Sequence, residues 1–346
     1  MTAATRSFPR HLLALALAAL LAGCAVGPAY ERPPVAAPAA WKSAPAEAGW
    51  QPAAPADAFD RGEWWKLFGD ATLDDLASRV QVSNQNIAAA VANYAQAQAL
   101  VRGQRAALFP QVTLDASARR TGGRDISAAT AAAAALGVDW QPDVWGRLRQ
   151  AVDSAQANAQ ASEADLAAAR LSAVGDLATN YFSLREADAE LRILDDTLEG
   201  YERSLQITRN RYAASIAAQS DVLQAETLYA NTQAERAALK RNRDALEHAI
   251  AVLVGVAPAD FSLPAAEWKT AVPDVPAELP STLLERRPDI AAAERQVAAA
   301  NAQIGIARSA YYPNFSLSGG ISTSASRLGD LFNASNTLWS LGLSVA

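Results

Sequence analysis

The stretch RAALFPQV, residues 105–112, ends a helical pattern and begins a strand pattern, and RSAYYPNF, residues 308–315, repeats that change. The alanine-rich runs before them also match, at residues 87–90 and 290–293, and the offset between the two copies is 203 (313 − 110) without a gap. A helix, an aromatic-proline break and a strand that recur together predict an internal duplication. The second copy is expected to be incomplete, because a further long hairpin would follow Ala346 in a chain with two full copies.

Apolar and polar residues alternate after each junction, which predicts strands with one apolar face. The apolar positions are Val112, Leu114, Ala116, Ala118, Leu136, Val138 and Trp140, and then Phe315, Leu317, Ile321, Trp339, Leu341, Leu343 and Val345. The positions between them are mainly small or polar, and a turn rich in Gly, Ser and Ala is expected between the first two strands. An apolar outer face and a polar inner face are typical of a membrane barrel around water. Because the smallest bacterial barrels use about eight strands, several protomers are expected to pool their four strands.

Apolar residues at three-four spacing predict long coiled-coil helices between the two sets of strands. The spacing begins after Arg147 and continues for about 65 residues, which at about 1.5 Å per residue makes a helix on the order of 100 Å long. The chain is expected to reverse at 213–218 and to form a second helix at about 219–254. Further helices are expected at about 73–108 and 283–310. The seam of the long helix, which Asp188 interrupts, holds Val174, Leu177, Tyr181, Leu184, Leu191, Leu194, Leu198, Tyr201, Leu205, Thr208 and Tyr212.

The amino terminus has the pattern of a bacterial lipoprotein signal peptide. A basic stretch precedes the apolar residues 12–21, which are fewer than the roughly 20 residues of a membrane-spanning helix, and residues 21–24, LAGC, resemble a lipobox. We expect residues 1–23 to be removed by cleavage between Gly23 and Cys24. Cys24, the only cysteine, is then expected to carry a diacylglycerol and an N-acyl chain. Several acyl chains on one residue hold a protein durably at a membrane.

Composition argues against an enzyme and against nucleic-acid binding. The net charge is −6, whereas proteins that bind nucleic acids present basic patches. After the signal peptide the chain has one histidine, His248, no second cysteine, no metal-ligand cluster and no nucleophile elbow around a serine. No catalytic residue, metal site or cofactor is expected beyond the covalent lipid on Cys24.

These patterns divide the chain into five parts. A signal peptide is followed by a lipidated, proline- and alanine-rich tether at 24–62. Residues 63–256 form a first repeat of a helix, two strands and the long hairpin. Residues 257–282 are a proline-rich equatorial segment, and residues 283–346 are the incomplete second repeat.

Motifs from Cys24 to the carboxyl end resemble those of one family. They are Cys24 with Gly27, Pro28 and Tyr30, Trp64-Trp65 with Phe68-Gly69-Asp70, Phe109-Pro110, Asp143-Val144-Trp145-Gly146-Arg147, Arg211-Tyr212, Asp221-Val222-Leu223 and Arg286-Arg287-Pro288-Asp289-Ile290. Together they resemble the TolC-like outer membrane factors, and most of all the lipoprotein branch that serves multidrug efflux pumps.

The resemblance implies a mainly α fold with membrane β structure. Three copies would combine four strands each into a twelve-stranded outer-membrane barrel, and their coiled-coil hairpins would form a periplasmic tunnel, or α-barrel. The implied partners are a periplasmic adaptor, an inner-membrane pump and the lipid of the outer membrane. The implied location is the outer membrane, with a lipid anchor and a long periplasmic extension.

The hairpin tip is the candidate docking site for the adaptor. Its residues are Arg211, Tyr212, Ser215 and Asp221. The tip departs from the family, which usually carries Gly and Ser after Arg-Tyr where this chain has Ser215 and Ala218. Asp221 is expected to cap a helix or accept a hydrogen bond at the tip, since a short carboxylate does so readily at a helix start. No gate residue is assigned, because the family's acidic constriction lies mainly in the second hairpin.

The function implied by the resemblance is export of small molecules such as drugs across the outer membrane. Metal efflux and type I protein secretion are alternatives, because a tunnel rich in Ala, Gln, Asn and Ser carries no chemical label. A periplasmic coiled-coil adaptor or structural lipoprotein is an alternative of another class, and the alternating strands argue against it.

Overall fold

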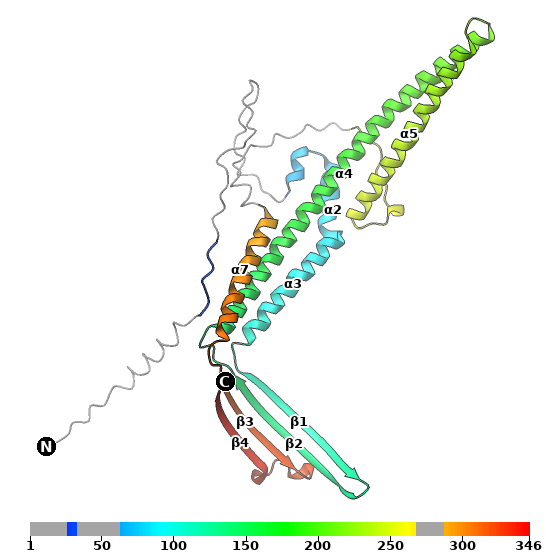
Figure 1. The fold of residues 1–346 in the computed structure, drawn as a ribbon. Coiled ribbons are helices and arrows are strands. Elements are labelled where there is room, and N and C mark those ends of the chain that lie inside the picture. The colour runs from blue at the N-terminus through cyan, green and yellow to red at the C-terminus, as the bar shows by residue number, and fades with distance from the viewer. Residues whose placement is uncertain (1–25, 33–62, 268–286) are drawn as a thin grey trace, which may run out of the picture. The chain divides into compact units, whose positions relative to one another are not determined.

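The computed structural model of the chain describes residues 26–32, 63–267 and 287–346. The predicted signal peptide, the cleavage site at Gly23 and Cys24, most of the tether and Arg286 lie outside these residues. The described chain forms two compact units (Figure 1). The sheet unit consists of residues 26–32, 93–164 and 289–346, and the hairpin unit contains residues 63–92 and 165–267.

The sheet unit contains an antiparallel sheet of four strands in the order β1-β2-β3-β4. Their bounds are β1 Gln111–Gly123, β2 Ile126–Trp140, β3 Phe315–Ala325 and β4 Thr337–Val345, which confirms the four predicted strands. The predicted turn between the first two strands is present but short, because β1 and β2 pair as far as Gly123 and Ile126 and the Ser- and Ala-rich residues belong to β2. Residues 129–135, mostly alanine, remain in the strand because they pair with β1 and, from Ala132 onward, β2 also pairs with β3.

Two helices of 22 residues lead into the same end of this sheet. α3, Gln85–Ala106, precedes β1, and α7, Pro288–Ser309, precedes β3; 288 − 85 and 309 − 106 both give 203. α7 begins at Pro288 with Asp289 in its first turn, positions that suit the fixed φ of proline and the helix dipole.

Small residues bring α7 against the first part of α4, Arg147–Ala213, within the sheet unit. Ala157, Ala298 and Ala299 form a buried cluster there. The Ser154 hydroxyl donates to the carbonyl of Ala299 at 3.2 Å. Side chains at a helix contact set the distance between the axes, so alanine and serine allow a close approach.

The hairpin unit is built on the remainder of α4 and on α5, Gln219–Leu253. α4 is continuous for 67 residues, which confirms the predicted long helix and its reversal before Gln219. The first part of the predicted seam is buried, at Val174, Leu177, Tyr181 and Leu184. After α5 the chain makes a single 3-10 turn, η2, Pro258–Asp260, and the described part of the proline-rich segment then has no regular structure.

The predicted helix at 73–108 is wrong, because the chain forms two helices there. α2, Ala71–Ser83, ends at Asn84, whose extended ψ of 124° separates it from α3. The Asn84 side chain accepts hydrogen bonds from the backbone N–H groups of Asn86 (3.0 Å) and Ile87 (3.2 Å). Its amide also donates to the carbonyl of Leu253 at 3.0 Å. Asparagine is a favoured N-cap residue, and here it ends one helix and starts the next.

The first described element of the hairpin unit is the 3-10 helix η1, Trp64–Phe68, which contains three aromatic residues. The Phe68 ring lies 4.8 Å from that of Phe182 on α4. Asp70 caps α2 through the N–H groups of Thr72 and Leu73 and also accepts a hydrogen bond of 2.6 Å from Tyr181. Among the described helices, none is both long enough and apolar enough to cross a membrane.

Candidate channel wall and hairpin tip

The register of the sheet places the predicted apolar residues of all four strands on one face. One row across the strands is Val112, Val138, Gly319 and Leu341, and the next is Leu114, Leu136, Ile321 and Trp339. The large side chains of both rows are exposed, as are those of Leu343 and Val345. A contiguous apolar face of this kind marks contact with a membrane or a partner protein.

The opposite face is small and polar. Its rows contain Gln111, Asp139, Ser318 and Gly342, then Thr113, Gly137, Gly320 and Ser340, then Asp115, Ala135, Ser322 and Leu338. Leu338 is an apolar exception on this face. β1 and β4 each have one edge without a partner strand in the described chain. The sheet is therefore a two-faced wall with two open edges.

Tryptophans connect the sheet to the helices at the end where α3, α4 and α7 meet it. The indole N–H of Trp140 donates to the carbonyl of Leu108 at 3.1 Å, and that of Trp145 donates to the carbonyl of Pro313 at 2.8 Å. The Trp145 ring also packs on Tyr312, with centroids 4.9 Å apart. Both tryptophans thus fix the junctions that the sequence repeats.

Residues 26–32, here called the strap, run along α4 and α7 within the sheet unit. The strap is held by backbone and side-chain bonds: Val26 N–H donates to the Trp145 carbonyl at 3.3 Å, and the Asn301 amide donates to the Pro28 carbonyl at 3.1 Å. The Tyr30 hydroxyl donates to the carboxylate of Glu294. Hydrogen bonds from Arg295 and from Tyr30 hold the pKa of Glu294 below its usual value. The described part of the predicted tether is therefore docked on helices, and it begins two residues after Cys24.

The hairpin tip brings together the four candidate docking residues. The N–H of Ile216 donates to the carbonyl of Arg211 (2.9 Å) and that of Ser215 to the carbonyl of Tyr212 (2.8 Å), which ends α4 in a Schellman motif. Ser215 has a φ of 62°, the left-handed conformation that usually selects glycine here. The family's usual glycine is thus absent, but the turn that it favours is present.

Asp221 accepts a hydrogen bond at the tip, as predicted. Its carboxylate lies 3.2 Å from the N–H of Ala218, the residue that precedes α5. Tyr212 and Ile216 are exposed beside it. The tip therefore presents an aromatic and an aliphatic side chain on a fixed turn, and its role in docking stays a prediction.

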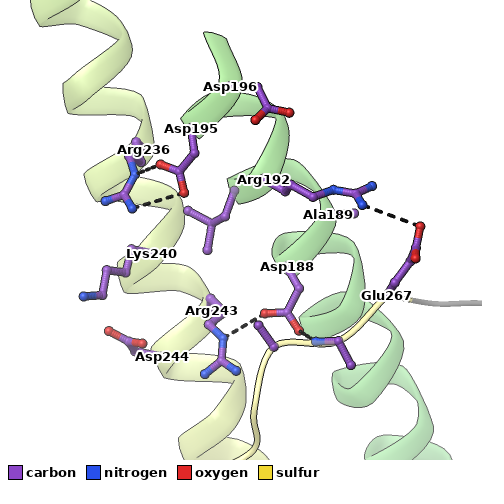
Figure 2. A pocket seen from close by; sticks show the side chains of 13 residues that line it. Asp188, Ala189, Arg192, Asp195, Asp196, Arg236, Lys240, Arg243, Asp244 and Glu267 are labelled. Carbon is purple, nitrogen blue, oxygen red and sulfur yellow. Dashed lines mark hydrogen bonds and ion pairs between the residues drawn. The ribbon is translucent and has the colours of Figure 1, made fainter. Parts of the chain in front are cut away.

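A charged pocket of about 610 Å³ lies between α4, α5 and residues 265–267 of the hairpin unit (Figure 2). Asp188 receives hydrogen bonds of 3.0 Å from both Arg185 and Arg243. Arg236 binds Asp195 and holds the pKa of that carboxyl below its usual value. Arg192 pairs with Glu267 at 3.5 Å.

The centre of this network is buried and was not predicted from the sequence. The side chains of Arg185 and Asp188 are only 4% and 3% exposed. Arg185 also donates to the carbonyl of Pro264 at 2.8 Å, and Arg243 donates to Glu247 at 2.5 Å. The one available signal was Asp188, a carboxylate in an otherwise apolar seam. The network ties the segment after α5 to the hairpin.

The described residues contain no candidate metal site. In residues 26–32, 63–267 and 287–346, no group of three or more His, Cys, Asp or Glu side chains is arranged to hold an ion. In the charged pocket, the ion pairs join acidic to basic side chains, so no group of carboxylates is left to bind a cation. The candidate functional features are therefore the sheet, with its apolar and polar faces, and the long hairpin.

Known proteins share this combination of sheet and hairpin. The outer membrane efflux protein family matches residues 76–256 and 279–346. The probable efflux pump outer membrane protein TtgC of Pseudomonas putida is 32% identical over 342 residues, which cover 95% of this chain and 70% of that protein. The cation efflux system protein CusC of Escherichia coli is 31% identical and is matched over 96% of this chain and 72% of its own length.

A solved structure agrees with these matches. The outer-membrane channel OprN has a TM-score of 0.78 at 31% identity, over 93% of this chain and 73% of that one. The agreement confirms the fold class predicted from the motifs, and it identifies an efflux channel component and not an enzyme. This chain belongs to the outer membrane efflux protein family.

Proposed function

We propose that three copies of this chain form an exit duct that carries small molecules across the outer membrane. The observation that carries the proposal is the sheet with one apolar face, one polar face and two open edges. Three sheets joined edge to edge supply twelve strands, above the minimum of about eight for a bacterial barrel. The apolar face would then meet lipid and the Ser- and Gly-rich face would meet water.

The hairpin supports a periplasmic extension for the same channel. A helix of 67 residues is on the order of 100 Å long, far more than a membrane needs. Its tip would meet a periplasmic adaptor that connects the channel to an inner-membrane pump. The exposed Tyr212 and Ile216 on the fixed tip turn support this role.

A photo-crosslinking residue at position 212 tests the docking at the tip. We expect it to form an adduct with the adaptor in cells, whereas the same residue at the exposed position 228, on α5, is the control and should form none. Adducts at position 228 but not at 212 would contradict the assignment.

Lipid on Cys24 is the second attachment that we propose. The strap supports it, because Cys24 is two positions before the docked Val26, a span of at most about 7 Å at 3.3–3.6 Å per position. Palmitate labelling should be lost in Cys24→Ser. With a cleavable signal supplied, this variant should still form trimers, because the sheet provides its own membrane contact. Loss of all membrane association would show instead that the lipid is the principal anchor.

Deletion of the gene tests the transport function. We expect greater sensitivity to dyes, detergents or antibiotics, restored by a plasmid-borne copy. Sensitivity confined to metal ions would favour the metal-efflux alternative, and loss of a secreted protein would favour type I secretion. An unchanged profile in a strain without paralogues would contradict efflux.

A further inference from the structure

Arginines gather at the end of the sheet away from the helices. Arg119 and Arg120 lie in the last part of β1, Arg124 lies in the turn before β2, and Arg327 follows β3. All four are exposed, and none has an ion pair or a side-chain hydrogen bond within the described part of the chain. Asp125 and Asp330 lie at the same end, so the balance of charge there is positive.

The register assigns two neighbouring arginines to different faces. Arg120 pairs with Thr130 and follows Ala118 on the apolar face. Arg119 pairs with Ala131 on the polar face. Arg327 lies two residues after Ala325, which pairs with Ala132 in the same apolar row as Ala118. Arg120, on β1, and Arg327, in the bend after β3, therefore both lie just beyond the last alanine row of the apolar face.

This level matches the far boundary of an apolar membrane layer. The run from Val112, at the helix end of the apolar face, to Arg120 is nine residues of β1. A strand that crosses the apolar band of an outer-membrane barrel needs about 9–11 residues, because it is tilted by about 45°. Side chains in the row before Arg120 are alanines, so its guanidinium has lipid chains on one side and headgroups on the other. This step rests on the proposed function, in which the apolar face lies in the membrane.

We propose that Arg120 and Arg327 bind phosphate groups of the lipids in the leaflet remote from the helices. A guanidinium binds phosphate with two parallel hydrogen bonds, and these two side chains have no carboxylate partner in the described chain that would compete. The apolar rows beside them add contact with the acyl chains, which favours a phosphorylated lipid over free phosphate. Basic residues at a membrane surface attract anionic lipids in the same way.

Lipid retention by the full chain tests this site. The protein is placed in nanodiscs of phosphatidylcholine with bisphosphorylated lipid A, and the lipids that remain bound are measured by native mass spectrometry. Removing one lipid-facing arginine should lower retention of lipid A about fivefold, the factor for about 1 kcal/mol. Arg120→Gln with Arg327→Gln should therefore lose most of it. Arg119→Gln, the neighbouring position on the polar face, is the matched control and should retain it.

Two further experiments separate the possible explanations. Inorganic phosphate alone should not raise the unfolding temperature, whereas lipid A should. The double variant Arg120→Lys with Arg327→Lys keeps both positive charges and should retain more lipid A than the double glutamine variant. This comparison also controls for a folding defect. Equal losses in Arg119→Gln and Arg120→Gln would overturn the proposal, as would equal retention of phosphatidylcholine and lipid A. Failure of the wild-type chain to enter nanodiscs at all would instead contradict the proposed function.

Discussion

Asp188 occupies a position in the α4 seam where apolar residues are expected, and the structure gives the reason. Its carboxylate joins Arg185 on its own helix to Arg243 on α5. The N–H of Ala266 approaches it as well, at 3.4 Å. A charge that is 3% exposed is tolerated only when it is paired and hydrogen-bonded. Asp188 therefore does not add apolar packing to the seam, but its hydrogen bonds attach the segment after α5 to the hairpin.

Replacing Asp188 with alanine should lower the free energy of unfolding by about 3–5 kcal/mol, because Arg185, which is buried, and Arg243, which is 13% exposed, lose a shared partner. The measurement is denaturant unfolding followed by tryptophan fluorescence. Asp196→Ala is the control: this carboxylate lies on the same helix, is exposed and has no partner within the described residues (Figure 2). It should change the free energy by no more than about 0.5 kcal/mol. Equal effects of the two variants would show that the network is not structurally important.

The contact between Tyr30 and Glu294 makes the docking of the strap dependent on pH. The folded-state pKa of Glu294 lies below its ordinary value of 4.5, because Arg295 and Tyr30 donate to the carboxylate. The part of this lowering that comes from Tyr30 stabilises the docked strap above the ordinary pKa, and this stabilisation is lost as the pH falls through the folded-state pKa. Hydrogen exchange of residues 26–32, corrected for intrinsic rates, should therefore show less protection near pH 3.5 than near pH 7.

Two variants check the cause. Tyr30→Phe should reduce the protection of the strap near pH 7, and Glu294→Gln should remove most of its pH dependence. Tyr311→Phe is a control, because this tyrosine is 88% exposed and has no hydrogen bond from its hydroxyl within the described chain. A pH dependence that survives in Glu294→Gln would assign the effect to another group.

At the scale of the helices, two glycines of the hairpin unit should respond oppositely to replacement by alanine. Gly255, just after α5, has a φ of 74°, and a Cβ there would lie 2.5 Å from the carbonyl oxygen of Ser83. Gly200, within α4, has nothing within 4 Å of such a Cβ. Gly255→Ala should destabilise by at least about 1–2 kcal/mol, and Gly200→Ala should stabilise by about 0.5–1 kcal/mol. The unfolding temperatures of both variants test these predictions. Shifts of the same sign in the two variants would contradict them.

Long-period patterns at this scale were predictable, and local breaks were not. The long helix, its reversal and all four strands follow from apolar spacing sustained over many residues. Asn84 interrupts one helical pattern with two hydrogen bonds that its side chain accepts from backbone N–H groups. In sequence, such a cap is indistinguishable from a polar residue on a helix surface. The alanines of β2 resemble a loop by composition, and only their pairing with β1 and β3 makes them a strand.

The candidate site was predictable in outline for the same reason. Alternation assigned the faces of the sheet, and the motifs located the tip residues. The conformation of Ser215 and the strap contact of Tyr30 depend on the folded backbone and on residues far apart in sequence, Tyr30 and Glu294 being 264 positions apart. Neither leaves a periodic signal.

At the scale of the whole molecule, the assignment of the two sheet faces can be tested with adjacent residues of β2. Leu136 lies on the apolar face between Leu114 and Ile321, and Ala135 lies on the polar face between Asp115 and Ser322. Leu136→Arg should destabilise membrane insertion by about 1–3 kcal/mol, because arginine on a lipid-facing position costs about 2–4 kcal/mol at the bilayer midplane and less toward the interfaces. Ala135→Arg should insert normally, because its charge faces water and Asp115. The measurement is the fraction of each variant that stays in the membrane after carbonate extraction. Equal insertion of the two variants would contradict the assignment of the faces. A greater loss in Ala135→Arg would show that the face assigned to lipid faces water, so that the exported molecule passes along it.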